Sequence, residues 1–447
     1  MTFRQAEEYL LGLELFGMRF GLDRMHKLMT VLGLPQRRFA SIHVVGTNGK
    51  SSTARFCAAI LARHGLRAGS YTSPHLGSFR ERIEVGEEPV SEADFAAAVQ
   101  RAAHAAELVN RTQEPDDGVT QFEALTAASY HELARRGVEV AVIEAGLGGR
   151  FDATNVIPSK VQVLTSIGLE HTRWLGPTLT DIADEKLAVV RDGGMLIVGD
   201  LEPDVFAAAQ RITAKRRAKL LTTEGGATSV PISRHKSPNP REAPARPADR
   251  GIAMRAPGRF QRRNFALAAA AAEAFLGRPL DQAAVERAGA ETRIPGRLDV
   301  VGERPLTVYD GAHNPEGARA LADSLDDVLG EHRPRVAVIG VLEDKDAAGM
   351  LDALLPHLDR AIFTRSSNPR SLPPATLATL TEKIGEPSDR SAPEVSALRA
   401  DTVSDPRAAV RRARALAGPG GAVLATGSIY LVADLVREQP IARASIL

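Results

Sequence analysis

The sequence feature that most constrains the fold is the stretch 42–53, Ile-His-Val-Val-Gly-Thr-Asn-Gly-Lys-Ser-Ser-Thr. A short β-branched run enters a turn marked by Gly46 and Gly49, and the apolar spacing of residues 54–64 predicts a helix directly after it. A strand, a glycine-rich loop and a helix in this order predict a phosphate-binding loop, because backbone N–H groups and the helix N-terminus attract an anion. In this interpretation Lys50 reaches the terminal phosphates and a hydroxyl group approaches Mg²⁺.

The motif is shorter than the consensus G-x-x-x-x-G-K-[ST], because Val44 stands where the first glycine would fall. An ordinary glycine turn followed by a surface lysine is the alternative. Two glycines, a lysine and three hydroxyl residues in register between a strand and a helix favour nucleotide binding over that alternative.

Composition limits the other possibilities. A chain of 447 residues is too long for one hydrophobic core and should divide into two or three domains. A net charge of +1 gives no reason to expect nucleic acid or an acidic membrane surface as a partner. No apolar run is long enough to cross a bilayer, and residues 1–20 read as an amphipathic helix rather than a secretory signal. We therefore expect a cytoplasmic protein in which the single cysteine, Cys57, is a buried core residue.

Strands and helices alternate along the chain. The apolar runs 138–143 and 161–167 predict central strands of a parallel sheet covered on both faces, with polar and glycine-rich residues after their carboxyl ends. This pattern predicts an α/β fold, with a P-loop-type doubly wound sheet in domain 1–296 and a smaller Rossmann-like α/β domain in 297–447. The segment 222–250, rich in Pro, Gly, Ser and Arg, has no hydrophobic period, and we assign it no role.

Acidic or imidazole residues stand at the carboxyl ends of three expected strands: Glu144, His171 and Asp310. Glu144 and His171 share a sheet edge with the phosphate loop. Binding of an ATP-bound Mg²⁺ ion would account for their position, because Mg²⁺ needs few protein oxygen ligands. Ser73, at another strand end, can add a hydroxyl group. Histidine is an unusual Mg²⁺ ligand, so the pattern alone leaves the role of His171 open.

Two polar loops have the character of substrate sites. Residues 148–155 carry more side-chain donors than a turn needs, and residues 310–315 have the same character in the second domain. Asn314-Pro315 also serves as a plain helix start. The simplest interpretation of residues 184–186, Asp-Glu-Lys, is a solvated helical face.

Eight short segments, spread over nearly the whole chain, form an ordered set. They are Gly46-Thr47-Asn48-Gly49-Lys50, Thr72-Ser73-Pro74-His75-Leu76, the run from Glu144 to Asn155, Glu170-His171-Thr172, Glu185-Lys186, Gln261-x-x-Asn264, Pro295-Gly296-Arg297 and the run from Asp310 to Pro315. In these segments the sequence resembles the folylpolyglutamate synthase/dihydrofolate synthase family of Mur-type ATP-dependent amide ligases. Each match is weak alone, but the set follows the family's order.

The resemblance implies a role for each matching residue. The ATP phosphates would contact Thr47, Asn48, Gly49 and Lys50, with Ser51 beside them. Two Mg²⁺ ions would be held, one by Ser73 and Glu144 and one by His171. Lys186 resembles the family's carbamylated lysine, whose carbamate adds an oxygen ligand, and this replaces the solvated-face interpretation. The contacts to adenine, phosphate and ribose would be Asn264, Arg297 and Asp310.

The resemblance also implies substrate contacts and a reaction. The pterin contacts would be Phe122, Phe151, Asp152 and Ala153, with Leu22, Asp23 and Arg24 nearby, and His313 would lie near the incoming glutamate. The reaction would activate a carboxylate as an acyl phosphate, which the amine of L-glutamate then attacks. The carboxylate would belong to dihydropteroate, to a reduced folate, or to both in a bifunctional enzyme. We expect a monomer, because such a ligase must open and close between its two domains.

Two other functions are possible on these residues. A Mur-type ligase for a different carboxylate usually carries an additional N-terminal substrate domain, whereas here the phosphate loop begins within the first fifty residues. A nucleotide-binding regulator without ligase activity would not need to retain the whole set Ser73, Glu144, His171, Lys186, Asp310 and His313. The sequence departs from the family at Ser51, where many members carry glycine, and in the irregular segment 222–250.

Overall fold

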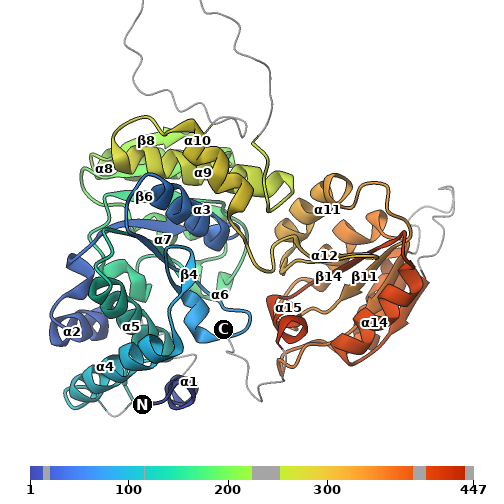
Figure 1. Cartoon of the computed structure of the whole chain (residues 1–447), viewed down its shortest axis with the longest axis horizontal. Coiled ribbons are helices and arrows are strands. Elements are labelled where there is room, and N and C mark those ends of the chain that lie inside the picture. Colours follow the sequence, from blue (N-terminus) through green and yellow to red (C-terminus); the bar gives the residue numbers. More distant parts are fainter. Residues whose placement is uncertain (14–20, 115, 224–251, 386–398, 438–447) are drawn as a thin grey trace, which may run out of the picture.

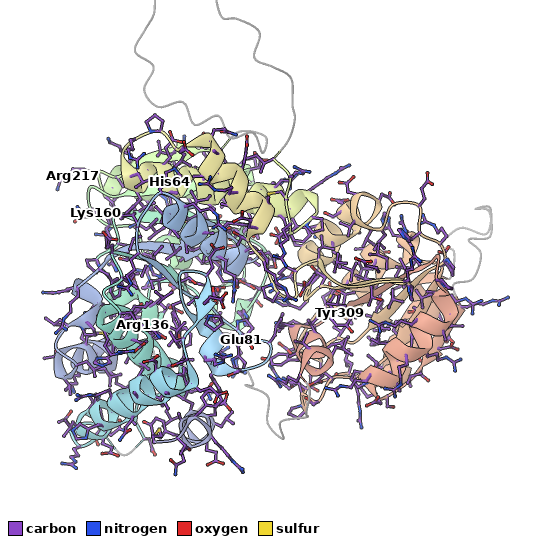
Figure 2. The ribbon with its side chains drawn as sticks, in the orientation of Figure 1. His64, Glu81, Arg136, Lys160, Arg217 and Tyr309 are labelled. Carbon is purple, nitrogen blue, oxygen red and sulfur yellow. The ribbon has the colours of Figure 1, made fainter. Side chains whose placement is uncertain are left out.

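The computed structural model describes residues 1–13, 21–114, 116–223, 252–385 and 399–437. Two α/β lobes lie side by side in Figure 1, the first coloured blue to yellow and the second orange to red. Side chains fill the interior of both lobes in Figure 2, which labels Glu81 in the first lobe and Tyr309 in the second. The two sheets fall on either side of residue 296, where the sequence predicts the domain boundary.

The sheet of the first lobe has the strand order β4-β3-β2-β5-β1-β6-β7-β8. Five neighbouring pairs, from β2 to β8, are parallel, while β3 pairs antiparallel with β2, and β4 with β3. Residues 82–85 alternate polar and apolar side chains before a turn at 86–88, but β3 and β4 are too short for this pattern to predict their antiparallel pairing. The strands are β1 (Ala40–Val45), β2 (Ala68–Tyr71), β3 (Ile83–Val85), β4 (Glu88–Pro89), β5 (Val140–Glu144), β6 (Val161–Leu164), β7 (Met195–Val198) and β8 (Lys219–Thr222).

Helices cover both faces of this sheet, as the all-apolar runs predict. Alternate residues of β5 point to opposite faces. Val140 and Val142 pack in one hydrophobic cluster with α3 (Lys50–Arg63) and α9 (Arg259–Leu276), whereas Ala141 and Ile143 pack with helices of the other face. The remaining helices of this lobe are α1 (Phe3–Gly12), α2 (Asp23–Val31), α4 (Glu92–Asn110), α5 (Gln121–Arg135), α6 (Thr172–Leu175), α7 (Leu179–Leu187), α8 (Pro203–Lys215) and α10 (Gln282–Glu291).

The sheet of the second lobe has the order β13-β12-β11-β14-β10-β9, with β9 antiparallel to β10 and the other pairs parallel. Its strands are β9 (Asp299–Glu303), β10 (Leu306–Tyr309), β11 (Arg335–Ile339), β12 (Arg360–Phe363), β13 (Arg399–Thr402) and β14 (Ala422–Thr426). Its helices are α11 (Pro315–Leu329), α12 (Ala347–Leu354), α13 (Pro374–Gly385), α14 (Pro406–Ala417) and α15 (Ile429–Val436). The expected doubly wound sheet followed by a smaller Rossmann-like domain is confirmed.

The lobes are joined by more than the connecting chain. Leu76 of the first lobe belongs to a hydrophobic cluster whose other buried members, among them Val432, come from the second lobe. The backbone carbonyl of Leu76 accepts a hydrogen bond from Arg437 Nε at 2.8 Å. The loop that carries Ser73 is therefore packed against both lobes.

Several sequence-based element limits need correction. The helix after the phosphate loop begins at Lys50 rather than at residue 54, and the first helix ends at Gly12. The rest of the expected first helix, residues 14–20, and residues 224–250 of the Pro-rich segment lie outside the described residues. Cys57 is fully buried, as expected. Within the described ranges, no helix has the length and apolar character needed to span a membrane.

Candidate active site

A cavity of about 990 Å³ opens between the lobes. Its lining includes the phosphate loop and the residues that follow β5, β6 and β10, so the carboxyl ends of strands from both sheets face the same space. This is the crevice that the sequence predicts for an open α/β sheet.

The phosphate loop has the backbone that its glycines allow. Gly46 and Gly49 have φ values of 148° and 86°, which favour glycine. A Cβ on Gly46 would lie 2.0 Å from Thr165 Oγ1, so the residues that follow β6 approach the loop too closely for a side chain at this position. Lys50 Nζ donates to the carbonyls of Gly46 and Thr47 at 3.0 Å each, which holds its ammonium group over the loop.

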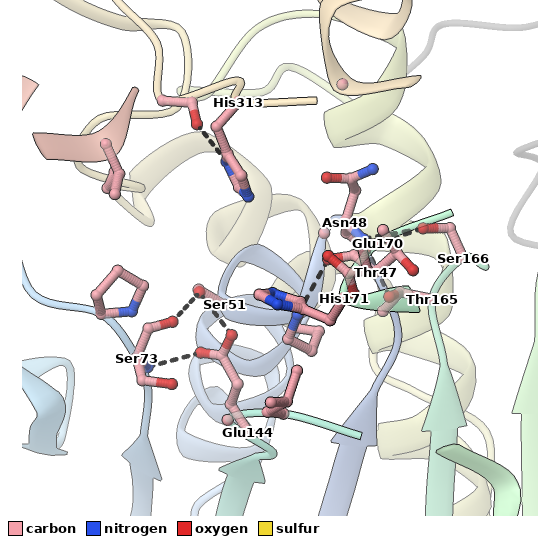
Figure 3. A pocket seen from close by; sticks show the side chains of 18 of the residues that line it. Thr47, Asn48, Ser51, Ser73, Glu144, Thr165, Ser166, Glu170, His171 and His313 are labelled. Atoms are coloured by element: carbon pink, nitrogen blue, oxygen red, sulfur yellow. Dashed lines mark hydrogen bonds between the residues drawn. The ribbon is translucent and has the colours of Figure 1, made fainter. Parts of the chain in front are cut away.

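Residues after β6 hold the loop from the other side, and the sequence did not single them out. Thr47 N donates to the Ser166 carbonyl at 2.8 Å, and Asn48 N donates to Ser166 Oγ at 3.0 Å. Thr165 Oγ1 donates to the Asn48 carbonyl at 2.6 Å. Figure 3 shows these side chains together at the edge of the cavity.

Glu144 lies at the centre of a second cluster, with Ser51 and Ser73. Ser51 Oγ donates to Glu144 Oε1 at 2.9 Å, and Ser73 N donates to Glu144 Oε2 at 2.9 Å, as Figure 3 shows. The carboxylate is buried, and burial raises its pKa although Lys50 nearby opposes that shift. Ser51, where the sequence departs from the family, therefore contacts the proposed metal ligand directly.

This donor set suits Mg²⁺ rather than a metal that needs a protein cage. Among the described residues, no three His, Cys, Asp or Glu side chains gather as a ready metal site. Mg²⁺ takes one or two carboxylates and leaves its other positions to water and phosphate. The Glu144 oxygens accept the two hydrogen bonds above from neutral groups, and an adjacent cation would offset the cost of burying this charge.

Lys186 is buried, so the solvated helical face that its local pattern predicts is wrong for this residue. Only 2% of it is exposed, and its Nζ donates to the Gly46 carbonyl at 2.8 Å and to Glu170 Oε1 at 3.0 Å. Burial lowers the pKa of Lys186 although Glu170 opposes that shift. Lys186 lies directly behind the phosphate loop rather than in the lining of the cavity.

Glu170 is a site residue to which the sequence assigned no role. Burial raises its pKa, but the ammonium groups of Lys186 and Lys50 outweigh burial and lower it to about 2. His171 follows it with a left-handed φ of 49° and lies in the cavity (Figure 3). A carboxylate next to a histidine, in the loop that follows a buried strand, is the signal that could have identified Glu170 from the sequence.

In the second lobe, Asp310 shapes the loop around it. Its Oδ1 accepts from Ala312 N at 2.8 Å and its Oδ2 from Leu298 N at 2.9 Å. His313 Nδ1 lies 2.9 Å from the Gly311 carbonyl, which can only accept, so Nδ1 carries the proton and Nε2 is an acceptor. Burial, with Arg297 adding to it, lowers the pKa of His313 to about 4, so the ring is neutral at pH 7.

Two further residues with implied nucleotide roles also line the cavity: Asn264 and Arg297. Asn264 Nδ2 donates to Gln261 Oε1 at 3.1 Å, and its Oδ1 lies so close to Gly49 that a Cβ there would be 2.3 Å away. Their contacts with a nucleotide stay predictions.

Most of the residues with implied pterin contacts line the same cavity: Arg24, Phe122, Phe151, Asp152 and Ala153. Both Asp152 oxygens accept from the backbone, from Leu147 N at 2.8 Å and Thr154 N at 2.9 Å. Leu22 and Asp23 are not part of the lining that the described residues form. Five of the seven residues with implied pterin contacts therefore line the cavity, and Leu22 and Asp23 do not.

Comparison with known proteins identifies the family. Residues 296–429 match the model of the Mur ligase glutamate ligase domain. The chain is 36% identical over 400 residues to the dihydrofolate synthase/folylpolyglutamate synthase of Mycobacterium tuberculosis, covering 83% of this chain and 80% of that one. The solved structure of M. tuberculosis folylpolyglutamate synthase complexed with ADP matches with a TM-score of 0.82 and 30% identity over 97% of both chains. E. coli FolC in complex with DHPP and ADP matches with a TM-score of 0.79 and 28% identity, again over 97% of both chains. The chain therefore belongs to the folylpolyglutamate synthase/dihydrofolate synthase family of Mur-type ligases.

Proposed function

We propose that the cleft joins L-glutamate to the carboxylate of dihydropteroate and to that of a reduced folate, so that one ATP-dependent ligase catalyses both reactions. The observation that carries this proposal is the convergence, at one cavity, of the phosphate loop, Glu144 and His313, with Lys186 directly behind the loop, in a chain whose relative is named for both activities. The E. coli neighbour supports it, because that protein's structure contains DHPP together with ADP.

The reaction begins with transfer of the terminal phosphoryl group of ATP to the carboxylate, which forms an acyl phosphate and ADP. Lys50 stabilises the charge on the transferring group, since its ammonium lies over the loop that cradles the phosphates. The amine of L-glutamate then attacks the acyl carbon, phosphate leaves, and the amide bond forms. The attacking ammonium must first lose a proton to the solvent, and the neutral His313 Nε2 can then accept a hydrogen bond from the amine and orient it in the cleft.

The residues that would hold Mg²⁺ are Ser73 and Glu144 for one ion, and His171 with a carbamate on Lys186 for the second. When bound, Mg²⁺ neutralises negative charge on the phosphoryl group. Enclosure between the lobes positions both reactants and excludes water that would hydrolyse the acyl phosphate.

A carbamate on Lys186 is chemically reasonable in this setting. Carbon dioxide reacts with a neutral amine, whose nitrogen bonds to the carbon and releases a proton, and the lowered pKa of Lys186 increases the neutral fraction.

We expect Lys186→Arg to keep a cation beside Glu170 but to lose about a hundredfold in turnover, because arginine forms no carbamate. The measurement is turnover together with the carbamate signal of the enzyme in ¹³C-bicarbonate by NMR. Lys160→Arg, at an exposed position, is the control and should keep both. Wild-type turnover in Lys186→Arg would contradict the proposed carbamate.

We further propose that the enzyme acts as a cytoplasmic monomer on small molecules, with neither nucleic acid nor a membrane as a partner. One chain supplies the whole cavity lining described above, and a net charge of +1 provides no broad electrostatic attraction to polyanions. Light scattering after size-exclusion chromatography should give the mass of one chain, and a dimer mass would contradict the proposal.

The deciding experiment is ATP- and Mg²⁺-dependent ADP release with L-glutamate, run separately with dihydropteroate and with tetrahydrofolate. Mass spectrometry of the products should show one added glutamate in each case. Activity with one acceptor alone would restrict the enzyme to that reaction. Inactivity with both, on protein that binds ATP, would favour a Mur-type ligase for a different carboxylate.

A further inference from the structure

The phosphate loop of the first lobe is bonded directly to the start of α11 in the second lobe. Asn48 Nδ2 donates to Asn314 Oδ1 at 3.3 Å, and Asn314 Nδ2 donates back to Asn48 Oδ1 at 3.1 Å. Asn48 Nδ2 also donates to Glu316 Oε2 at 3.2 Å. We call these three residues, Asn48, Asn314 and Glu316, the interlobe clasp.

Asn314 has two tasks in the clasp. Its Oδ1 accepts from Gly317 N at 2.7 Å, which makes it the N-cap of α11, and the same side chain pairs with Asn48. The backbone of Asn48 is held on the opposite side, because its N–H donates to Ser166 Oγ at 3.0 Å. The conformation of the loop is therefore determined from both lobes.

Glu316 extends this contact to Gly168, in the loop after β6. A Cβ on Gly168 would lie 2.1 Å from Glu316 Oε2, so the carboxylate sits against the bare backbone of this glycine. Gly168 N in turn donates to Thr47 Oγ1 at 3.0 Å, on the phosphate loop. The cavity lining includes Glu316, and burial raises its pKa, an effect that the nearby Glu170 carboxylate increases.

We infer that Asn314 and Glu316 are positioning residues that hold the phosphate loop, through Asn48, in the conformation that binds nucleotide. The family resemblance implies a nucleotide contact for Asn48, whereas in this structure the Asn48 amide group is bonded to the other lobe. Nucleotide affinity and the arrangement of the lobes are then coupled, and thermodynamic linkage makes that coupling reciprocal.

The first test separates the clasp from the helix cap. Serine caps helices as well as asparagine does, so Asn314→Ser keeps α11 but removes the amide pair with Asn48. We expect the Kd for a non-hydrolysable ATP analogue to rise about tenfold, as the loss of two hydrogen bonds predicts, with an unchanged melting temperature. Glu316→Ala should also raise the Kd for the ATP analogue. Glu316→Gln should have a Kd near that of the wild type, because glutamine can still accept a hydrogen bond from Asn48 Nδ2.

Gly168→Ala tests the same contact without altering any clasp residue. The added methyl group would displace the flexible end of Glu316 while leaving its charge, and we expect a rise in Kd similar to that of Glu316→Ala. The matched control is Asp405→Ala, which removes the N-cap of α14 in the same lobe, where Asp405 accepts from Ala408 N at 2.6 Å. It should lower the melting temperature and leave the Kd unchanged.

Measurements of product rest on the proposed function, whereas the Kd for a nucleotide can be measured without ligase activity. The nucleotide Kd is therefore the primary test of the inference. Asn314→Ser and Glu316→Ala should also release more ADP per amide formed, because a loosely held loop no longer links phosphoryl transfer to the second lobe. Wild-type Kd values in Asn314→Ser, Glu316→Ala and Gly168→Ala would overturn the inference. Raised Kd values in an enzyme without ligase activity would support the clasp and reject the proposed function.

Discussion

Lys50→Ala is expected to abolish measurable ADP formation, with turnover falling about a thousandfold. The ammonium group lies 3.0 Å from the carbonyls of Gly46 and Thr47, where it would meet the terminal phosphates of ATP. The neighbouring Lys186 is not free to replace it, since its ammonium group is paired with Glu170. The measurement is ADP release under saturating ATP, Mg²⁺, L-glutamate and acceptor.

Two comparisons show whether Lys50→Ala impairs the chemical step rather than folding or nucleotide binding. Lys215→Ala, an exposed change in the last turn of α8, should match the wild type in turnover and in melting temperature. Single-turnover measurements at saturating nucleotide should retain the defect of Lys50→Ala, because the lost interaction acts on the transferring phosphoryl group. Near-wild-type turnover would remove Lys50 from the catalytic set.

Glu144→Gln is expected to reduce turnover by about two to three orders of magnitude and, at the same time, to raise the melting temperature of the metal-free protein. Glutamine keeps the shape of the side chain and can still bond with Ser51 and Ser73. It removes a buried negative charge, and the raised pKa of Glu144 shows that burial disfavours that charge in the folded state. At pH 7, above this group's unfolded pKa, ionised Glu144 therefore costs stability that the neutral amide does not.

A fall in turnover together with a rise in melting temperature distinguishes a metal ligand from a structural residue. Raising the Mg²⁺ concentration should restore part of the activity of Glu144→Gln but none of the activity of Lys50→Ala, because only the former weakens metal binding. Thermal melting with and without Mg²⁺ provides the second measurement, and Mg²⁺ should stabilise the wild type more than Glu144→Gln. An equal Mg²⁺ requirement in the wild type and Glu144→Gln would contradict the proposed metal role.

Local patterns predicted the first lobe well and parts of the second poorly. The phosphate loop and the buried strands β5 and β6 carry strong signals, namely paired glycines and unbroken apolar runs. Helix α14 has only a weak signal in the sequence, because its buried residues are small and lie among arginines, although Asp405-Pro406 is a proper helix start. The alternating residues Ile83, Glu84 and Val85 mark β3, but β3 and β4 are too short for that pattern to specify how they pair with the sheet.

The site residues show the same division between local and distant causes. Lys186 lies on a helix whose local pattern is polar, yet it is buried because its Nζ reaches Gly46, 140 residues earlier in the chain. Glu170 received no role from the sequence, because its importance comes from its ion pair with Lys186. Leu22 and Asp23 were expected near the substrate, but the first turn of α2 directs Arg24 rather than these two toward the cavity.

The sequence by itself determined the α/β class, the phosphate loop, the identity of the strand-end residues and, through the ordered motifs, the family. These follow from backbone preferences and apolar periods, which act over a few residues. The tertiary structure alone decided that Lys186 is buried against Glu170 and that Asn48 bonds to Glu316, 268 residues away. The first contact depends on how distant segments of one lobe fold against each other, and the second on how the two lobes pack together, and no local preference encodes either arrangement.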